Sequence, residues 1–446
     1  MSLIQKLRAR AADHKPVRVV VIGAGKFGSM YLSQVPRTPG IHLLAVVDLS
    51  PNRAKESLAR VGWDEPRYSA SSLQDAAKSG ATYITDDAQK TIASEYVDIV
   101  VDATGSPAAG IAHALLCIEH RKHIIMVNVE ADVLAGPLLA RKAAQAGVIY
   151  SMASGDQPAL IAELVDWART IGMEVVCAGK GTKYLPIYHQ STPETVWGHY
   201  GFTEQQVAGG DFNAQMFNSF LDGTKSALEM AAVSNGCDLS PPQDGLMFPP
   251  CGVDDLPDIL RPVSAGGILS QKGTVEVVSS IERDGRPVFR DLRWGVYVVF
   301  EAPSQYVMDC FSQYGLKTDK SGKYAAMYKP YHLIGLELGI SVATIAVRGE
   351  ATGATGDWKA DVVATAKRNL KTGDKLDGEG GFTVYGKLMT AADSLRLGAL
   401  PIGLAHNMVL KKDIPAGKPV CWDDVDYDAT KQAIQFRQEM ERVFRL

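Results

Sequence analysis

The sequence has little of several features that mark specialised classes of protein. It has no apolar run near the roughly 20 residues that a membrane-spanning helix requires, so we expect no membrane partner. Its 46 basic and 50 acidic side chains leave a net charge of −4, which argues against nucleic acid as a partner. The six cysteines form no CxxC motif, so we expect free thiols, a reducing cytoplasmic location and no structural zinc.

The length and composition are those of a large globular protein. The chain has 446 residues, about three times the roughly 150 expected for one domain, so we predict two or three domains. Hydrophobic residues make up 46% and charged residues 22%, which excludes a mainly disordered chain. The 42 glycines indicate places where the backbone turns tightly or approaches a ligand.

A glycine-rich motif follows the first apolar segment and indicates a dinucleotide site. Residues 19–22 form an apolar strand that runs into the motif and then into a helical pattern. Such glycines let the backbone approach a pyrophosphate, and the helix N-terminus offers unpaired N–H groups. A second strand ends at Asp48, where a carboxylate would accept hydrogen bonds from an adenosine ribose. The motif residues expected to bind the cofactor are Gly23, Gly25, Lys26, Phe27 and Gly28.

The residues after the second strand leave the choice between NAD and NADP open. Asp48 alone favours NAD, because a carboxylate binds a free ribose hydroxyl. Arg53 follows closely and could hold the 2′-phosphate of NADP if its side chain turns inward. In the alternative interpretation, Arg53 only begins a helix in solvent.

The alternation of strand and helix continues to about residue 155. Apolar strands are expected over residues 97–105, 123–129 and 148–154, with helices between them. This pattern predicts an α/β Rossmann domain with a doubly wound parallel sheet over residues 1–155. Because ligands bind at the carboxyl ends of such strands, we expect further cofactor contacts from Ala103, Thr104 and Gly105.

The pattern changes after residue 155 and indicates a second domain over residues 156–326. Residues 274–303 are typical of two long strands joined by a turn at Asp284 and Gly285. We therefore predict an α+β domain with an open sheet, a common platform for dimerisation, and expect a homodimer. Two lysines, Lys180 and Lys183, directly follow another predicted strand.

One helix of this second domain carries Asp222, Lys225 and Glu229. Lys225 and Glu229 are four residues apart and could form a surface ion pair worth roughly a few tenths of a kcal/mol. Alternatively, Asp222 and Lys225 face the cofactor as a charge-matched catalytic pair. The spacing leaves both interpretations open.

These motifs together resemble homoserine dehydrogenase. The similarity rests on the glycine motif, on residues 179–184 and on the helix of Asp222 and Lys225. Residues 327–350 are similar to that family's returning helix, which implies that they complete the dinucleotide domain. Residues 128–132 lack the lysine that the family carries there, which argues against homoserine as the substrate.

The C-terminal residues 351–446 contain an internal repeat. Its two copies, residues 361–378 and 406–424, place Gly373 and Gly417 at corresponding positions. The repeat resembles a small β-rich SAF-type β-clip domain. A homoserine-dehydrogenase-like body followed by a SAF-like domain resembles the DXR-like family of 1-deoxy-D-xylulose 5-phosphate reductoisomerase-like enzymes.

The resemblance implies an NADPH-dependent enzyme of isoprenoid precursor biosynthesis, with NADH as the alternative cofactor. Its reaction converts 1-deoxy-D-xylulose 5-phosphate to 2-C-methyl-D-erythritol 4-phosphate by retro-aldol and aldol steps followed by hydride transfer. The phosphorylated substrate requires cations, which we assign to Lys180 and Lys183, with His189 nearby in sequence. Asp222 and Lys225 would move the proton.

The same reaction usually uses a divalent metal to stabilise an enediolate. Carboxylate ligands suit Mg²⁺ or Mn²⁺ in octahedral geometry. The candidates that we consider as ligands are Asp156, Glu194, Glu204 and Asp211.

Two other functions compete with the reductoisomerase. The first is a homoserine-dehydrogenase-like enzyme that oxidises or reduces a hydroxy acid or amino alcohol without rearrangement. The second is a non-catalytic sensor that binds a nicotinamide cofactor and a partner protein. Lysines in the pocket argue against the sensor, since sensors tend to lose charged pocket residues.

Overall fold

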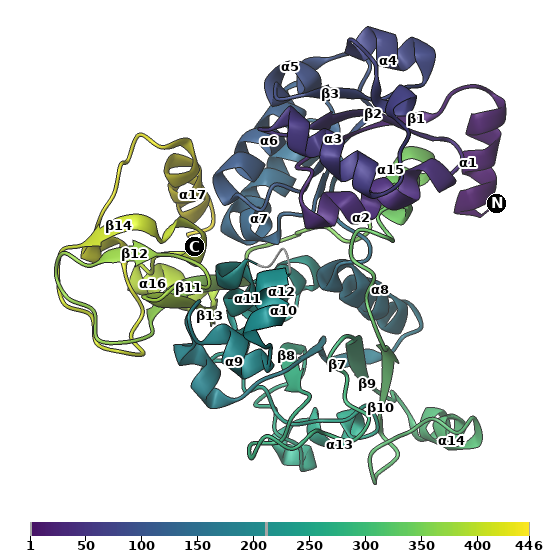
Figure 1. Cartoon of the computed structure of the whole chain (residues 1–446). Helices are drawn as coiled ribbons and strands as arrows, with labels where there is room; N and C mark the ends of the chain where they lie inside the picture. Colours follow the sequence, from purple (N-terminus) through teal and green to yellow (C-terminus); the bar gives the residue numbers. More distant parts are fainter. Residues whose placement is uncertain (1, 210–212, 446) are drawn as a thin grey trace. The chain divides into compact units, whose positions relative to one another are not determined.

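The computed structural model describes residues 2–209 and 213–445 and divides the chain into two compact units (Figure 1). The first unit contains Met1–Leu160 together with His332–Gly356. The second contains Ile161–Tyr331 together with Asp357–Leu446. Among the residues described, no helix is long and apolar enough to cross a membrane.

A six-stranded parallel sheet forms the centre of the first unit and confirms the predicted doubly wound fold. The strand order is β3-β2-β1-β4-β5-β6, and the order reverses between β1 and β4, where such sheets bind dinucleotides. β1 and β4 are almost entirely buried, because helices cover both faces of a parallel sheet. The strands are β1 (Val17–Ile22), β2 (Ile41–Val47), β3 (Tyr83–Thr85), β4 (Ile99–Asp102), β5 (His123–Met126) and β6 (Tyr150–Met152).

The helices of this unit begin where short polar side chains cap them. Ser50, Ser106 and Asn128 each accept a hydrogen bond from a backbone N–H of the first turn. The helices are α1 (Leu3–Ala12), α2 (Lys26–Gln34), α3 (Pro51–Arg60), α4 (Leu73–Ser79), α5 (Ala88–Ala93), α6 (Pro107–Glu119), α7 (Val129–Gln145) and α15 (Gly339–Arg348).

Residues 332–356, which come late in the sequence, pack against β1 of the first unit. Leu338 and Val342 are fully buried in the same apolar cluster as Val19 and Val21 of β1. α1 also contacts α15, and Lys6 Nζ donates a hydrogen bond to a backbone carbonyl there at 3.0 Å. Residues 332–356 therefore belong to the dinucleotide unit, close to the range of 327–350 that the sequence indicates.

A mixed four-stranded sheet supports the second unit. Its order is β10-β9-β7-β8, with β7 parallel to β8 and antiparallel to β9. The two strands predicted over 274–303 are present, although each is short, and they do not pair with each other because β7 lies between them. The turn at Gly285 exists, but the long connection from 280 to 295 lets the chain cross to the other side of β7. The strands are β7 (Glu174–Thr182), β8 (Thr274–Ser279), β9 (Val296–Glu301) and β10 (Tyr324–Lys329).

Two glycines at the end of β7 permit unusually close contacts with neighbouring backbone. A Cβ atom on Gly179 would lie 1.8 Å from the carbonyl oxygen of Glu276. One on Gly181 would lie 1.9 Å from the carbonyl oxygen of Leu292. Only glycine fits at these two positions, so packing accounts for them without a ligand.

Helix α12 (Thr224–Cys237) is the central helix of the second unit. It contacts β7 and β8 of the mixed sheet and also β11 and β13 of the C-terminal segment, and almost all its residues are buried. The remaining helices before the C-terminal segment are α8 (Gln157–Thr170), α9 (Val196–Tyr200), α10 (Glu204–Gly209), α11 (Ala214–Leu221), α13 (Leu256–Ile259) and α14 (Gln305–Gln313).

The two copies of the C-terminal repeat pair with each other. Leu370 N–H donates to the Ile414 carbonyl at 2.8 Å, and Ile414 N–H donates back at 3.0 Å. Gly373 and Gly417 follow with φ of +88° and +78°, which only glycine adopts readily. The elements are β11 (Ala360–Ala366), β12 (Lys375–Asp377), β13 (Val384–Thr390), α16 (Ala391–Leu397), β14 (His406–Leu410), β15 (Val425–Asp426) and α17 (Gln432–Val443).

Candidate functional site

The glycine motif has the local geometry that a dinucleotide requires. Gly23 has φ of +101°, and a Cβ atom on it would lie 2.7 Å from the carbonyl oxygen of Ala103. A Cβ atom on Gly28 would lie 2.4 Å from the Gly23 carbonyl, so this glycine lets α2 pack against the turn. Gly25 instead faces open space, immediately before the free N–H groups of α2. The motif therefore fits a pyrophosphate, which would approach at Gly25.

Asp48 and Arg53, the residues predicted to bind the ribose, form an ion pair. Asp48 is buried and accepts hydrogen bonds at 2.9 Å from the backbone N–H groups of Ala24 and Ser50. Burial raises the pKa of Asp48, but Arg53 at 2.8 Å and these N–H groups together hold it below its ordinary value. Arg53 thus turns toward the motif, although its side chain remains 60% exposed. Asp48 and Arg53 lie together, so this position has a carboxylate that could bind a ribose hydroxyl and a guanidinium that could bind a 2′-phosphate.

The loop after β4 is held rigidly from the sheet side. Asp102 is fully buried, accepts a hydrogen bond from the Thr104 hydroxyl at 2.9 Å and lies 2.5 Å from His113 Nδ1. Asn128 donates to the carbonyl oxygen of Ser106 at 2.7 Å. These contacts fix the backbone of the predicted cofactor residues Ala103, Thr104 and Gly105.

In the second unit, Lys180 and Glu229 form a buried ion pair between β7 and α12. Their side chains are only 7% and 3% exposed. Sequence reasoning considered Lys225 as the partner of Glu229, but the carboxylate faces Lys180 instead. Lys225 is half-buried one helical turn earlier, on the same face of α12 as Glu229. An ammonium and a carboxylate in such a dry place can hold and transfer a proton.

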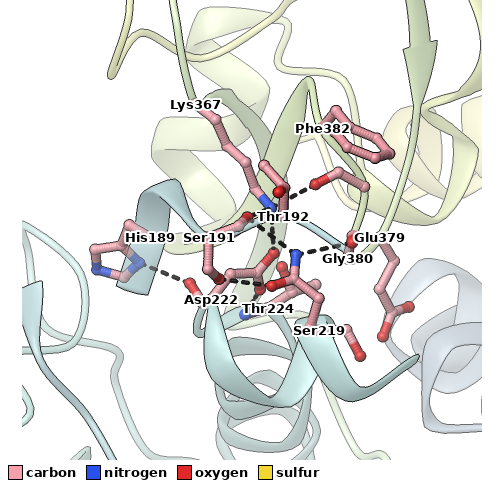
Figure 2. Close-up of polar contacts among 12 residues, drawn as sticks. His189, Ser191, Thr192, Ser219, Asp222, Thr224, Lys367, Glu379, Gly380 and Phe382 are labelled. Carbon is pink, nitrogen blue, oxygen red and sulfur yellow. Dashed lines mark hydrogen bonds and ion pairs between the residues drawn. The ribbon is translucent and has the colours of Figure 1, made fainter. Parts of the chain in front are cut away.

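Asp222 pairs with a lysine of the C-terminal segment, as Figure 2 shows. Lys367 Nζ lies 2.7 Å from Asp222 Oδ2 and also donates to the carbonyls of Ser191 and Gly381 at 2.8 and 2.7 Å. Burial raises the pKa of Asp222, and Lys367 counteracts this shift. The sequence indicated Lys225 as the charge partner of Asp222 and did not point to Lys367. The one local signal was a lysine directly after residues 360–366, which are mostly apolar.

His189 is enclosed beside this pair. Its Nδ1 lies 2.7 Å from the Asp222 carbonyl oxygen and its Nε2 lies 2.9 Å from the Tyr184 hydroxyl. The ring stacks on Tyr385 with centroids 4.6 Å apart, and burial lowers the pKa of the imidazole. Both nitrogens are engaged, so His189 supports the Asp222 turn rather than offering a cation to a phosphate.

Lys183 lies just beyond the end of β7. Its Nζ donates to the carbonyl oxygen of His199 at 2.6 Å and lies 6.0 Å from the ring centre of Tyr200. Burial and the charge of Arg293 lower the pKa of Lys183. Of the two lysines assigned to a phosphate, Lys183 therefore has no carboxylate partner among the described residues, whereas Lys180 has Glu229.

The four predicted metal ligands do not form a site in the part of the chain that the structure describes. Asp156 belongs to the first unit, and Glu194 and Glu204 are exposed residues of the second. Asp211 lies outside the described residues. No three His, Cys, Asp or Glu side chains are grouped for metal binding in residues 2–209 and 213–445. We therefore derive no step through a metal ion.

Two protein-family models match adjacent parts of the chain. Residues 17–151 match the N-terminus of dihydrodipicolinate reductase. Residues 155–338 match the catalytic domain of oxidoreductase DRL. With the cofactor motif of the first unit, these matches define an NAD(P)-dependent oxidoreductase. No curated protein is significantly similar to the chain in sequence.

Several solved structures are similar to the chain at low identity. A probable dehydrogenase from Thermotoga maritima has 15% identity and a TM-score of 0.39, covering 76% of this chain and 91% of that one. An NAD-binding oxidoreductase from Klebsiella pneumoniae has 14% identity and a TM-score of 0.33, covering 72% and 67%. The 1-deoxy-D-xylulose 5-phosphate reductoisomerase from Zymomonas mobilis has 18% identity and a TM-score of 0.35, covering 49% and 57%. Such values do not identify a substrate.

Proposed function

We propose that this oxidoreductase uses NADPH to convert 1-deoxy-D-xylulose 5-phosphate to 2-C-methyl-D-erythritol 4-phosphate. The observation that carries the proposal is the buried pair of Lys180 and Glu229, one turn from Lys225. It lies within the segment that matches the catalytic domain of oxidoreductase DRL. The sequence resemblance to reductoisomerase-like enzymes supplies the substrate class.

The rearrangement requires a base and a cation, and this cluster has both. Glu229 would accept the proton of a substrate hydroxyl, after which the neighbouring carbon–carbon bond breaks to give an aldehyde and an enediolate. The ammonium groups of Lys180 and Lys225 would stabilise the negative enediolate oxygen, because charges act strongly in a buried site. A proton then moves from one enediolate oxygen to the other, and a different enediolate carbon attacks the aldehyde. The aldehyde oxygen takes back the proton that Glu229 accepted, and the product is a branched aldehyde.

The final step is a reduction. NADPH supplies a hydride when bound. The aldehyde oxygen then takes a proton from the Lys225 ammonium, which stabilises the alkoxide as it forms. Solvent subsequently returns a proton to the lysine.

A simple dehydrogenase is the second candidate. One ammonium–carboxylate pair suffices to protonate the oxygen of a carbonyl that accepts a hydride, and Lys180 with Glu229 provides such a pair. In that case the substrate is a hydroxy acid or amino alcohol and its carbon chain stays unchanged.

The test is NADPH oxidation with 1-deoxy-D-xylulose 5-phosphate, with Mg²⁺ or Mn²⁺ present and then removed by a chelator. Oxidation with a branched product by NMR would support the proposal. An unrearranged product would support the simple dehydrogenase, and no oxidation despite NADPH binding would overturn the substrate assignment. Lys225→Ala should abolish turnover and retain NADPH binding, with the surface variant Lys371→Ala as the control.

A further inference from the structure

A cavity of about 250 Å³ lies in the first unit, where α2 and α3 end. Its walls come from the turn Val35–Arg37, from the residues directly after α3 and from the turn Glu65–Tyr68. Pockets for drug-sized ligands typically have roughly 300–1,000 Å³, so this cavity suits a smaller molecule. The lining residues are Pro36, Arg37, Val61, Gly62, Trp63 and Arg67.

This cavity is separate from the predicted cofactor site. α2 begins at the glycine motif and α3 begins just after Asp48, at the carboxyl ends of β1 and β2. Both helices run back along the sheet side by side (Figure 1), so they end at its opposite edge. The nine residues of α2 alone span roughly 13 Å. A molecule in the cavity would therefore leave the glycine motif accessible to the cofactor.

Two arginines of the cavity wall carry charges that no carboxylate neutralises. In the part of the chain that the structure describes, neither Arg37 nor Arg67 forms an ion pair, whereas Arg53 of the same unit pairs with a buried carboxylate. Asp64 and Glu65 precede Arg67 in the sequence, but both are exposed and pair with neither arginine. The cavity therefore offers two positive charges to an anion.

Neutral contacts hold both guanidinium groups in place. The Arg37 guanidinium donates a hydrogen bond to the carbonyl oxygen of Ser33. The Arg67 guanidinium lies over the Trp63 ring, 4.6 Å from its centre. Trp63 is only 9% exposed, and its indole N–H donates a hydrogen bond to the Leu32 carbonyl at 2.8 Å. A cation held by such contacts keeps its charge and loses less side-chain freedom when an anion binds.

We propose that this cavity binds a small phosphate monoester through Arg37 and Arg67. Each planar guanidinium matches two phosphate oxygens, and the charge of the dianion equals that of the two arginines. Pro36 and Val61 make part of the wall apolar, which suits the short carbon chain of an ester. The proposal does not depend on the reaction assigned to the enzyme, because it concerns a second site in the first unit.

The first test is a calorimetric titration of the full chain, saturated with NADPH, with ethyl phosphate. Arg37→Gln and Arg67→Gln should each weaken binding by about tenfold or more, which corresponds to roughly 1.4 kcal/mol. Both arginines are exposed, so the variants should melt at the same temperature as the wild type without ligand. Arg8→Gln removes an exposed arginine of α1 and is the control, with a change of less than about twofold. Equal affinity in all four proteins would overturn the proposal.

Hydrogen exchange measured by mass spectrometry locates the bound molecule. Ethyl phosphate should slow exchange in peptides that cover residues 35–38 and 61–68 of the wild type and of Arg8→Gln. The same peptides of Arg67→Gln should show no protection at that concentration. Protection confined to the glycine motif or to the second unit would place the ligand elsewhere and contradict the proposal.

A comparison of two probes distinguishes an ester from free phosphate. Inorganic phosphate lacks the carbon chain that would contact Pro36 and Val61, so ethyl phosphate should bind at least about threefold more tightly. An equal or higher affinity for inorganic phosphate would overturn the assignment of an ester, since the apolar part of the wall would then contribute nothing.

Discussion

Lys367 and Asp222 form an ion pair at 2.7 Å in which both side chains are almost completely buried. The lysine follows β11, and the aspartate ends α11 immediately before α12. The C-terminal segment therefore takes part in shaping the turn that precedes α12, the helix of Lys225 and Glu229. It is a supporting part of the second unit.

The first prediction concerns the energy of this pair. Lys367→Met leaves the Asp222 carboxylate buried without its cation, which should lower the free energy of unfolding by about 3–5 kcal/mol. Urea denaturation measures the change. The double variant Lys367→Met with Asp222→Asn removes both charges and should recover most of the loss. Lys371→Met, in an exposed pair with Asp413, is the control and should change stability little. Equal effects of the two single lysine variants would contradict the prediction.

The second prediction concerns the buried pair of the candidate active site. Glu229→Gln removes the base beside Lys180 and should lower kcat by about a hundredfold or more, with no change in NADPH affinity. Adding Lys180→Met should restore stability but not turnover, because it removes the unpaired ammonium without restoring a base. Steady-state kinetics and cofactor titration measure both effects. Glu163→Gln at the surface is the control, and a Glu229→Gln enzyme as active as that control would refute the role.

The third prediction concerns the choice of cofactor. Arg53 is the one cation paired with Asp48 in the described structure, so it is the side chain placed to bind a 2′-phosphate. Arg53→Ala should weaken NADPH binding by about tenfold and NADH binding by less than about twofold. Fluorescence titration of both cofactors measures the ratio, with the exposed Lys55→Ala as the control. Equal losses for NADPH and NADH would show that Arg53 does not discriminate between them.

The fourth prediction concerns pH and the buried Asp132. Tyr150 and Thr355 donate hydrogen bonds to this carboxyl at 2.9 and 2.8 Å, yet burial outweighs them and raises its pKa to about 6. The folded chain thus holds the proton more tightly than the unfolded chain, whose carboxyl has its ordinary pKa near 3.8. The stability contributed by Asp132 is therefore complete below that ordinary pKa and declines as the pH rises to about 6.

Asp132→Asn keeps an acceptor for Tyr150 and Thr355 but cannot ionise. Its stability relative to the wild type should therefore increase by up to about 3 kcal/mol between about pH 4 and 7. Denaturation at a series of pH values measures the difference. The exposed variant Asp64→Asn is the control, and parallel pH profiles for both variants would exclude this role for Asp132.

The glycine-rich turn of the first unit could be predicted from sequence because its signals are local. Gly23, Gly25, Gly28 and Asp48 lie in a strand–turn–helix–strand unit in which each residue's role follows from its neighbours along the chain. The structure gives two of these glycines the close contacts that such a turn needs. The repeated alternation of strand and helix along residues 1–155 likewise predicted the parallel sheet.

The second unit was harder to predict because its key contacts join distant segments. The sequence gives no sign that β7 inserts between β8 and β9. Nor does local spacing show that Glu229 faces a strand lysine instead of Lys225. Charge pairs across a fold depend on topology, which hydrophobic periodicity does not specify.

The return of residues 332–356 to the first sheet affects the order in which the protein can assemble during synthesis. Leu338 and Val342 fill the same apolar cluster as β1, so that cluster stays open until the ribosome has passed them. By then residues 161–331 have already emerged as one long insertion between two parts of a single core. The first unit can thus complete its core only after residue 356 has been made, and the second only after residues 357–446 have followed.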